Sequence, residues 1–280
     1  MSRLNFVVDE NVLLRSFLQN QNISKKSLST IKQNGALLVN GCPVTVRYQL
    51  SIGDVVEIIL PKESHSPNLI PSSGEVTVLY EDAHICIVDK PAFMNTIPSQ
   101  LHPHDSLIER VLYHFQKMGD ESNPHPVNRL DRNTSGIVVF AKHQLMHHLM
   151  TGIIEKYYIA NVVGDMKNHG NICTPIERAR DSIITRMVSI YGKHARTEYQ
   201  LLNKNHQYSQ LWIRLHTGRT HQIRVHFASM NHPLQGDTLY GLDDTINRHA
   251  LHAVQIKFVH PITYEVLTIS SPCPTDMQLL

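Results

Sequence analysis

The sequence predicts an α+β fold, in which a small α/β module precedes a larger domain built on a mixed, largely antiparallel sheet. Segments with strand composition dominate residues 75–280 and alternate irregularly with only two helical segments, which argues against a repeating βαβ layout. Residues 1–60 form a separate block with its own helical faces and turns. Residues 61–74 contain three prolines and four serines without an amphipathic period, which is typical of an exposed linker.

The N-terminal block is predicted to begin with two helices and to continue with short strands. Apolar side chains share one face of each helix: Leu13, Leu14, Phe17 and Leu18 in the first, Leu28 and Ile31 in the second. Ser24 is the expected N-cap of the second helix, and Asn34-Gly35 is its expected C-cap. Strand composition is found in residues 36–40, 44–46 and 54–60.

The larger domain, residues 75–280, is predicted to be rich in strands. Runs of β-branched and aromatic residues predict strands at 76–80, 85–88, 137–141, 157–163, 197–202, 210–215, 253–259 and 266–270. Helical spacing of apolar residues predicts helices at 106–117 and 143–155. This mixture places the domain in the α+β class.

Composition excludes several classes of protein. At 280 residues with 41% hydrophobic content, the chain can bury a sizeable core. It contains no run of about 18 apolar residues, so we expect no membrane span, and its N-terminus lacks the charged-then-apolar order of a signal peptide. The four cysteines are scattered and form no C-x-x-C, which favours reduced thiols in the cytoplasm.

Positive charge is concentrated in two regions, although the net charge is only +2. Residues 178–224 contain nine Lys or Arg against two Asp or Glu, and residues 1–62 contain seven against four. Two basic regions are the pattern expected of a protein that lays two surfaces on phosphates. The alternative is an ordinary set of solvated strand faces and loops.

The stretch P-V-N-R-L-D-R-N-T-S-G-I-V-V-F-A-K, residues 126–142, is the most informative part of the chain. It places one carboxylate, Asp131, between Arg129 and Arg132, and arginines on both sides are expected to keep it ionised. A turn then leads into a short buried strand, which would give the carboxylate a rigid support. Such a group is a candidate nucleophile. From the residues alone, a surface salt bridge beside a hairpin is an equally good interpretation.

Nineteen histidines raise the question of a metal site. His143 and His147 have the i, i+4 spacing of ligands on a helix, and His249 lies close to His252. However, no H-E-x-x-H and no cysteine pair at zinc-finger spacing accompanies them, so we predict no metal site. The sequence also lacks G-x-x-x-x-G-K-[ST] and G-x-G-x-x-G, which leaves nucleotide hydrolysis and nicotinamide chemistry without support.

Several blocks, in order, resemble the signatures of the RluA-type pseudouridine synthases. N-R-L-D-R-N-T-S-G-I-V-V-F-A-K, from Asn128, resembles the family's H-R-L-D-x-x-T-S-G-L and the strand that follows it. Further blocks follow at the expected distances: E-K-Y-Y-I-A from Glu155, T-G-R-T-H-Q-I-R-V-H from Thr217, H-P-L-Q-G-D from His232, L-Y-G from Leu239, L-H-A from Leu251 and F-V-H-P from Phe258. The resemblance runs from about Val76 to the C-terminus.

The resemblance implies a pseudouridine synthase sheet with an active cleft across its middle, and it implies roles for three residues. Asp131 would be the catalytic aspartate, acting either by attack on ribose C1′ or by removal of a ribose proton. Tyr158 would stack on the target base, with Tyr157 packing on the opposite strand face. Arg224 would pair with Asp131 and fill the space left by a flipped base. No cofactor is implied, because the reaction only moves one bond within the nucleotide.

Other basic residues are expected to bind RNA. In the catalytic domain these are Arg129, Arg132 and Arg219. In residues 1–60, the order of elements with V-N-G and I-G-D-V-V resembles the alpha-L RNA-binding motif, a module shared with a small-subunit ribosomal protein. This resemblance covers about 55 residues and implies that the second helix binds RNA through Lys25, Lys26 and Lys32.

Two positions depart from the family pattern. Asn128 replaces the usual His of H-R-L-D, and its amide is expected to hydrogen-bond backbone or phosphate. Phe93 stands where the family's N-K-P-x-G block has glycine. Both changes bear on substrate preference more than on chemistry.

The resemblance therefore predicts a cytoplasmic, monomeric, cofactor-free RNA pseudouridine synthase. Large-subunit ribosomal RNA is the preferred substrate, because the N-terminal module resembles the arrangement in members that act on that RNA. Transfer RNA is an alternative substrate, since some members modify it. A non-catalytic RNA-binding or ribosome-assembly factor on the same fold is a second alternative, which the presence of Asp131, Tyr158 and Arg224 together disfavours.

Overall fold

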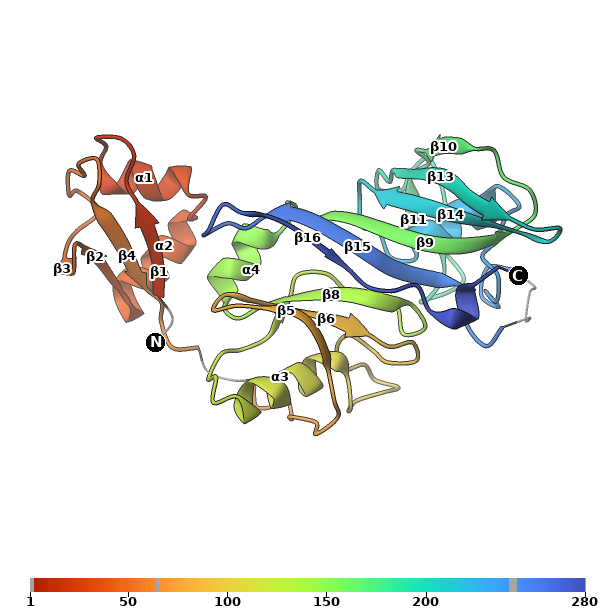
Figure 1. The fold of residues 1–280 in the computed structure, drawn as a ribbon, viewed down its shortest axis with the longest axis horizontal. Helices are drawn as coiled ribbons and strands as arrows, with labels where there is room; N and C mark the ends of the chain where they lie inside the picture. Colours follow the sequence, from red (N-terminus) through yellow and green to blue (C-terminus); the bar gives the residue numbers. More distant parts are fainter. Residues whose placement is uncertain (1–2, 64–65, 242–245, 280) are drawn as a thin grey trace.

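A computed structural model describes residues 3–63, 66–241 and 246–279. A small module at one end contains the N-terminal residues, and a long sheet forms the rest of the molecule (Figure 1). The predicted α+β class is confirmed, because the large sheet is mixed and mostly antiparallel.

The N-terminal module is a four-stranded antiparallel sheet with two helices. In chain order its elements are β1 Arg3–Val7, α1 Leu14–Asn20, α2 Lys25–Asn34, β2 Ala36–Val39, β3 Cys42–Pro43 and β4 Val55–Ile59. The strands lie in the order β1-β4-β2-β3. The side chain of Ser24 caps α2 by accepting a hydrogen bond from the Ser27 amide at 3.1 Å, as the sequence predicts.

Two features of this module differ from the sequence-based expectation. Strand β1 was not predicted, although it pairs along its whole length with β4. The predicted strand at 44–46 is wrong: the ladder partner of β2 is Cys42–Pro43, and the chain then turns. The turn is closed because the Tyr48 amide donates to the Thr45 carbonyl at 3.0 Å. Local turn hydrogen bonding thus overrides the strand propensity of Val44 and Val46.

The segment that follows the module has no helix or strand among its described residues, as expected of a linker. It is nevertheless attached to the larger domain at several points. Glu63 bonds His125 at 2.6 Å and accepts from the Gln144 amide at 2.7 Å. Ser72 bonds the carboxylate of Asp105 at 2.7 Å. The prediction of an exposed linker is therefore only partly right, because parts of the segment are hydrogen-bonded to the larger domain.

The larger domain is built on a ten-stranded sheet in the described residues. Its strands are β5 Thr77–Glu81, β6 Ile85–Lys90, β7 His125–Pro126, β8 Ser135–Ala141, β9 Glu155–Val163, β10 His169–Ile172, β13 Thr197–Lys204, β14 Tyr208–Leu215, β15 Leu251–Val259 and β16 Val266–Ser270. The main order is β10-β13-β14-β9-β15-β8-β6-β5, with β16 on β15 and β7 on β8. Strands β8 and β15 are the parallel pair at its centre. All eight predicted strands are present.

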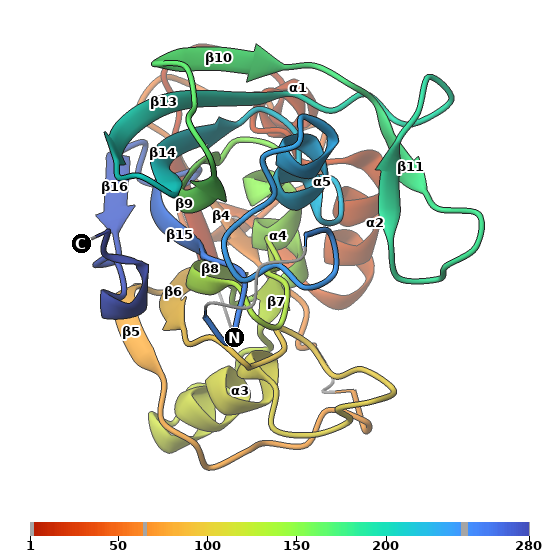
Figure 2. The same cartoon turned by 90° about the vertical axis from the view of Figure 1, so that its right-hand side faces the viewer.

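A separate hairpin and three helices complete the domain. The hairpin consists of β11 Ile176–Arg178 and β12 Arg186–Val188, and the helices are α3 Leu107–Lys117, α4 Gln144–Met150 and α5 Gln222–Ser229. A 3₁₀ turn, Thr275–Met277, lies near the C-terminus. Figure 2 shows α5 between the sheet and the hairpin.

In the larger domain, the helical prediction was right for α3 and only partly right for α4. Helix α3 begins with a capping box of Ser106 and Glu109. The helix predicted at 143–155 ends at Met150, because Gly152 takes a left-handed φ of 87° and Glu155 already belongs to β9. Helix α5 was not predicted. It is buried from Gln222 to Phe227, so it has no polar face and no amphipathic period to reveal it.

Burial at the centre of the sheet fixes the position of the site. Every residue of β8 is buried, which explains the uninterrupted apolar run of this strand. Gly136, with a φ of 109°, packs directly against the backbone of Ala253 on β15, where a β-carbon would clash. One buried apolar cluster also joins the N-terminal module to α4 through residues such as Ile31, Leu60 and Leu145. Within the described residues, no helix is long and apolar enough to cross a membrane.

Candidate active site

Asp131 lies in a turn that leads directly into the buried strand β8. The turn is closed because the Thr134 amide donates to the Asp131 carbonyl at 3.1 Å. The residue before Asp131, Leu130, makes two hydrogen bonds with the Thr96 hydroxyl. The Leu130 amide donates to Thr96 Oγ1 at 3.1 Å, and the Leu130 carbonyl accepts from the same hydroxyl at 3.0 Å. The carboxylate is therefore held by a fixed backbone, as the sequence predicts.

Lys90, at the end of β6, stabilises the same turn through hydrogen bonds from its side chain. Its side chain is fully buried, and its ammonium donates to the carbonyls of Pro91 at 2.9 Å, Met94 at 2.8 Å and Arg132 at 3.2 Å. Burial lowers the pKa of Lys90 to about 7, and the charge of Asp131 opposes this shift. One ammonium thus joins the loop after β6 to the loop that carries Asp131.

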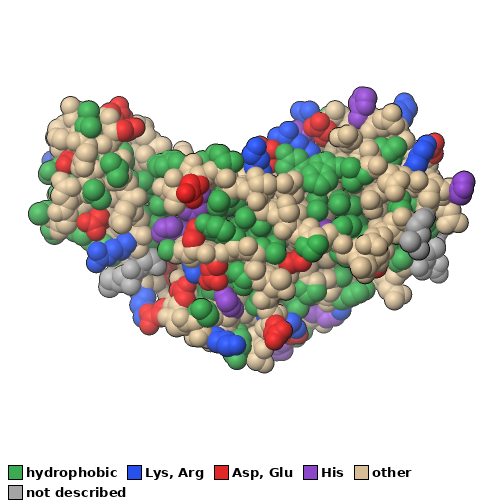
Figure 3. Space-filling model, viewed as in Figure 1, with side chains coloured by type: hydrophobic (Ala, Val, Ile, Leu, Met, Phe, Trp, Pro, Cys, Tyr) green, Lys and Arg blue, Asp and Glu red, His purple; other side chains and the backbone are tan. Residues whose placement is uncertain are grey.

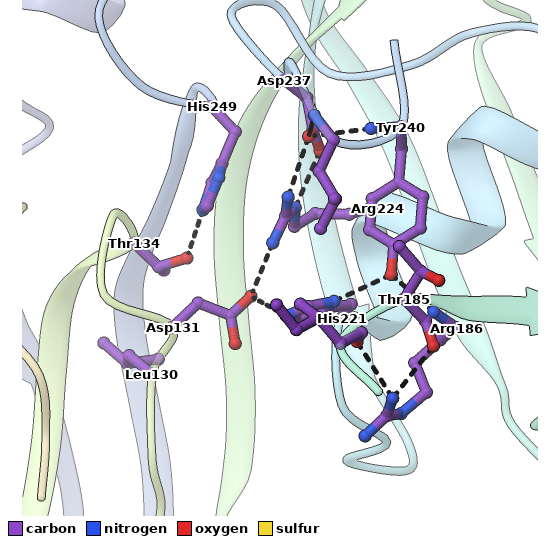
Figure 4. Close-up of polar contacts among 12 residues, drawn as sticks. Leu130, Asp131, Thr134, Thr185, Arg186, His221, Arg224, Asp237, Tyr240 and His249 are labelled. Carbon is purple, nitrogen blue, oxygen red and sulfur yellow. Dashed lines mark hydrogen bonds and ion pairs between the residues drawn. The ribbon is translucent and has the colours of Figure 1, made fainter. Parts of the chain in front are cut away.

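The contacts of the Asp131 carboxylate come from α5 and its N-cap, far along the chain. Arg224 Nη1 donates to Oδ2 at 3.3 Å, and His221 Nε2 lies 3.7 Å from the same oxygen (Figure 4). The flanking Arg129 and Arg132 are exposed, and the side chain of Arg132 donates to Asn133 Oδ1 at 3.5 Å. The pairing of Asp131 with Arg224 that the resemblance implied is therefore present.

Arg224 is fixed by a second carboxylate and by an aromatic ring. Its Nε and Nη2 atoms donate to the two oxygens of Asp237 at 2.7 and 2.8 Å, and its guanidinium lies 5.0 Å from the centroid of the Tyr240 ring. Burial alone would raise the pKa of Asp237, but the hydrogen bonds and charge of Arg224 outweigh it and lower that pKa. This bidentate pair leaves Nη1 free to reach Asp131.

Tyr158 and Tyr157 occupy opposite faces of β9, as the alternation of a strand requires. Tyr158 is buried on the face of Asp131 and lines the same cavity. Burial, and then the charge of Asp131, raises the pKa of its hydroxyl, so this group stays protonated at neutral pH. Tyr157 packs on Trp212 with ring centroids 5.6 Å apart. The predicted assignment of the two faces is confirmed.

A cavity of about 600 Å³ lies above these side chains. Its walls include Asp131, Tyr158 and His221, together with all three arginines expected to bind RNA: Arg129, Arg132 and Arg219. Lys156, two residues before Tyr158 on β9, also lines it, and burial lowers the pKa of this lysine. The volume falls within the range of about 300–1,000 Å³ that is usual for small-molecule sites. The cavity beside Asp131 therefore has the size of a small-molecule site.

The lysines of the N-terminal module lie away from this cavity. Lys25, Lys26 and Lys32 are exposed on α2. Lys26 borders a second, larger groove of about 1,120 Å³, which runs between α2 and the segment around β7 and α4. Their expected contact with RNA stays a prediction.

The two departures from the family pattern have local explanations. Asn128 donates to the Ile137 carbonyl at 3.1 Å and accepts from the Val139 amide at 2.8 Å, so its side chain continues the ladder of β8. Its predicted backbone hydrogen bonding is confirmed. Phe93 takes a φ of 66°, a left-handed conformation that glycine adopts at no steric cost. Phe93 therefore adopts a backbone conformation that favours glycine.

Sequence reasoning missed five residues of the site: Lys90, Lys156, His221, Asp237 and Tyr240. Each lies in a block that resembles the family, so a signal was present. Their roles depend on partners far along the chain, however, and a pattern of neighbouring residues does not show those partners.

The histidine pairs considered for metal binding have other partners. His143 accepts a hydrogen bond from the Met146 amide at 3.0 Å and so begins α4, while His249 bonds Thr134 at 2.8 Å and His252 bonds Ser135 at 2.9 Å. Elsewhere in the described part of the chain, potential ligand atoms of Glu81, Cys86 and His114 lie close together. The ammonium of Lys142 already binds Glu81 at 2.8 Å and Asp120 at 2.9 Å, as expected of an ion-pair network.

The chain is similar in sequence to known RNA pseudouridine synthases. A model of the family described as RNA pseudouridylate synthase matches residues 84–229. The chain is 40% identical to an uncharacterized RNA pseudouridine synthase of Bacillus subtilis, YjbO, over 92% of this chain and 94% of that protein. It is 33% identical to the ribosomal large subunit pseudouridine synthase D of Xanthomonas campestris, over 92% and 83% of the two chains.

The fold is also that of solved pseudouridylate synthases. The structure of human RNA Pseudouridylate Synthase Domain Containing 1 superposes with a TM-score of 0.61 at 22% identity, covering 74% of this chain and 88% of that one. The sequence matches cover most of the chain, and the structure places the aspartate of the family's signature in a cavity. The chain therefore belongs to the RNA pseudouridylate synthase family and is an RNA pseudouridine synthase of the RluA type.

Proposed function

We propose that this protein converts specific uridines of large-subunit ribosomal RNA into pseudouridine, with Asp131 as the catalytic group. The observation that carries the proposal is that Asp131 and Tyr158 line one cavity of about 600 Å³, while Arg224 contacts Asp131 from a smaller pocket of about 70 Å³ that the same two side chains also line. These groups come from three separate parts of the fold, yet they meet around the carboxylate of Asp131. The preference for ribosomal RNA is supported by the similarity to a ribosomal large subunit pseudouridine synthase, which covers 92% of this chain.

The reaction breaks the bond from ribose C1′ to uracil N1 and forms a bond from C1′ to C5 of the same base. The uridine has to leave its stack, since a paired base would not reach a cavity of this kind. Asp131 then acts on the ribose, either by attack on C1′ or by removal of a ribose proton. The base turns against the ring of Tyr158. Arg224 keeps its ion pairs with Asp131 and Asp237, and its burial speaks against the expectation that it fills the space left by the flipped base. All of these groups belong to one chain, so a monomer suffices.

The N-terminal module contributes binding in this proposal. Its exposed lysines, Lys25, Lys26 and Lys32, contact phosphates outside the target nucleotide. Because the module is joined to the catalytic domain, the two surfaces act on the same RNA, and binding of one raises the effective concentration of the other.

The test is to map pseudouridines in total RNA from cells with and without the gene, then to restore the gene as wild type, Asp131→Asn or Asp165→Asn. We expect one or more positions of large-subunit RNA to lose the signal without the gene. Asp131→Asn should fail to restore it, since the amide is no nucleophile. Asp165 is an exposed carboxylate that pairs with Lys204, so its substitution is the matched control and should restore the signal.

Three other outcomes have definite meanings. Loss of a signal in transfer RNA alone would favour the alternative substrate. Loss of no signal would favour a non-catalytic binding protein. Restoration by Asp131→Asn at the wild-type level would remove the central part of the proposal.

A further inference from the structure

His221 stands at an unusual place for a histidine. It is the N-cap of α5, with φ 56° and ψ 20°, a left-handed conformation that side-chain-bearing residues adopt uncommonly. Such conformations persist where the surrounding structure imposes them, and they cluster at functional sites. Here the conformation turns the imidazole into the cavity, where it is 12% exposed and reaches the Asp131 carboxylate (Figure 4).

The far nitrogen of the ring is held by Tyr240. His221 Nδ1 lies 2.8 Å from the Tyr240 hydroxyl, and the oxygen of that hydroxyl accepts a hydrogen bond from the Arg186 amide at 2.8 Å. Because the Tyr240 oxygen accepts from the Arg186 amide, the hydroxyl proton of Tyr240 is available for donation to another acceptor. His221 Nδ1 lies within hydrogen-bond distance of it. When Tyr240 donates to Nδ1, the imidazole carries its proton on Nε2, toward Asp131.

The charges around the ring favour its neutral form. Burial lowers the pKa of His221, and the positive charges of Arg224 on α5 and Arg186 on β12 act in the same direction. The negative charges of Asp131 and Asp237 oppose them. Two groups of different charge therefore lie beside the Asp131 carboxylate. The cationic Arg224 is 3.3 Å from Oδ2, and the His221 imidazole is 3.7 Å from it.

Both of these groups lie on the same oxygen, Oδ2. We propose that His221 is a positioning residue, which as a neutral imidazole donates from Nε2 to Oδ2 of Asp131 and leaves Oδ1 as the oxygen that acts on the ribose. The inference rests on the proposed role of Asp131 and deepens it. The distance of 3.7 Å is that of the free enzyme, and catalytic hydrogen bonds commonly tighten when substrate binds. Tyr240 acts one step further away, by fixing the tautomer.

The decisive variant is His221→Gln, because the glutamine amide keeps a donor on a side chain of similar reach but does not titrate. Single-turnover rates on the RNA identified by mapping would be measured against pH, over the range in which circular dichroism shows every variant to be folded. We expect His221→Gln to keep a rate within about tenfold of wild type. The fall of its rate at low pH should begin at a lower pH than in the wild type. In the wild type, protonation of His221 places a second cation beside the Asp131 carboxylate, which makes that carboxylate less reactive.

Two further variants separate donor, tautomer and backbone. His221→Asn tolerates the left-handed conformation but is too short to reach Asp131, so it should lose about 100-fold in rate while binding RNA normally. Tyr240→Phe keeps the ring on which Arg224 packs and removes the hydroxyl alone. It should lose roughly threefold to tenfold, since part of the population then carries the proton on Nδ1. His216→Ala, an exposed histidine of the same segment, is the control and should match wild type.

The outcomes distinguish this inference from the proposed function. If the wild type makes no pseudouridine, or if Asp131→Asn is fully active, the proposed function itself is wrong. If wild type is active and Asp131→Asn is inactive, but His221→Asn and Tyr240→Phe keep the wild-type rate, the positioning role is overturned. A pH profile of His221→Gln that superimposes on that of wild type would overturn it as well.

Discussion

The two faces of the sheet carry the same set of side chains in different surroundings. On the cavity face, Arg224 pairs with Asp237 at 2.7 Å and packs 5.0 Å from the Tyr240 ring. On the opposite face, Arg214 pairs with Glu155 at 2.8 Å and packs 5.8 Å from the Tyr157 ring. The first pair is 7% and 1% exposed, whereas both members of the second are 41% exposed. Burial is the main difference between them.

That difference decides what each arrangement does. An exposed ion pair contributes about 0–1 kcal/mol, because water and salt screen it. A buried pair stabilises little in total, but removing one member leaves a charge without solvent or partner. The cavity face is therefore committed to one geometry, which suits a catalytic site. Substitution of the exposed pair on the opposite face is expected to change stability little. Figure 3 shows hydrophobic side chains at the surface over the sheet, on the side viewed in Figure 1.

The largest expected effect is that of Arg224→Met compared with Arg214→Met. The first should destabilise the protein by about 3–5 kcal/mol, because Asp237 keeps its buried charge, and it should also abolish turnover. The second should cost less than about 1 kcal/mol and leave turnover unchanged. Urea unfolding and single-turnover assays measure the two effects. Equal losses in the two variants would mean that burial is not what separates the faces.

The two neighbouring tyrosines test the same contrast for binding of the base. Tyr158→Ala should reduce turnover by roughly 5- to 150-fold, since stacking on an aromatic ring contributes about 1–3 kcal/mol per base. Tyr157→Ala should have little effect on turnover, because this ring packs on Trp212 away from the cavity. Rates would be compared at a temperature where both variants are folded. The reverse order would show that the faces of β9 have been assigned to the wrong functions.

Buried histidine on the cavity face should make stability depend on pH. Burial lowers the pKa of His249 to about 3, and the nearby Arg224 adds to this effect. In the unfolded chain, His249 therefore binds a proton near pH 6.5, whereas in the folded chain it stays neutral at that pH. Stability is complete above that pH and falls as the pH drops toward the folded value, by at most about 1.4 kcal/mol per pH unit for one group.

His249→Gln isolates this contribution. Urea unfolding at pH 7.5 and pH 5, which lie on either side of about 6.5, should show a smaller loss of stability in the variant than in wild type. Other buried histidines, such as His143, whose pKa burial lowers to about 4, keep part of the dependence. The exposed His216→Gln serves as the control. A loss in His249→Gln as steep as in wild type would show that His249 is protonated in the folded protein.

The smallest effect per residue is expected at the exposed lysines of the N-terminal module. Replacing Lys25, Lys26 and Lys32 by Ala should weaken RNA binding and reduce the slope of log affinity against log salt by about 0.7–0.9 for each phosphate that the module no longer neutralises. The rate at saturating RNA should change little. A triple variant of Lys117, Lys167 and Lys257, all exposed on the catalytic domain, removes equal charge and is the control. An unchanged slope in the first variant would show that α2 does not touch RNA.

The sequence by itself determined those parts of the protein that depend on neighbouring residues. The eight main strands of the catalytic domain, the cap of α2 by Ser24 and the opposed faces of Tyr157 and Tyr158 all follow from local periodicity or composition. The ordered blocks also identified Asp131 and Arg224 as partners. Short-range physics sets these features, since they need no knowledge of what packs against them.

Only the tertiary structure decided the full surroundings of Asp131. The contacts of His221 with Asp131 and with Tyr240 bring together groups that no local pattern relates. Helix α5 escaped prediction because it is buried nearly all round, and strand β1 because its pairing with β4 spans the whole module. In each case the free energy comes from burial and from contacts across the fold, and the linear sequence does not display either of them.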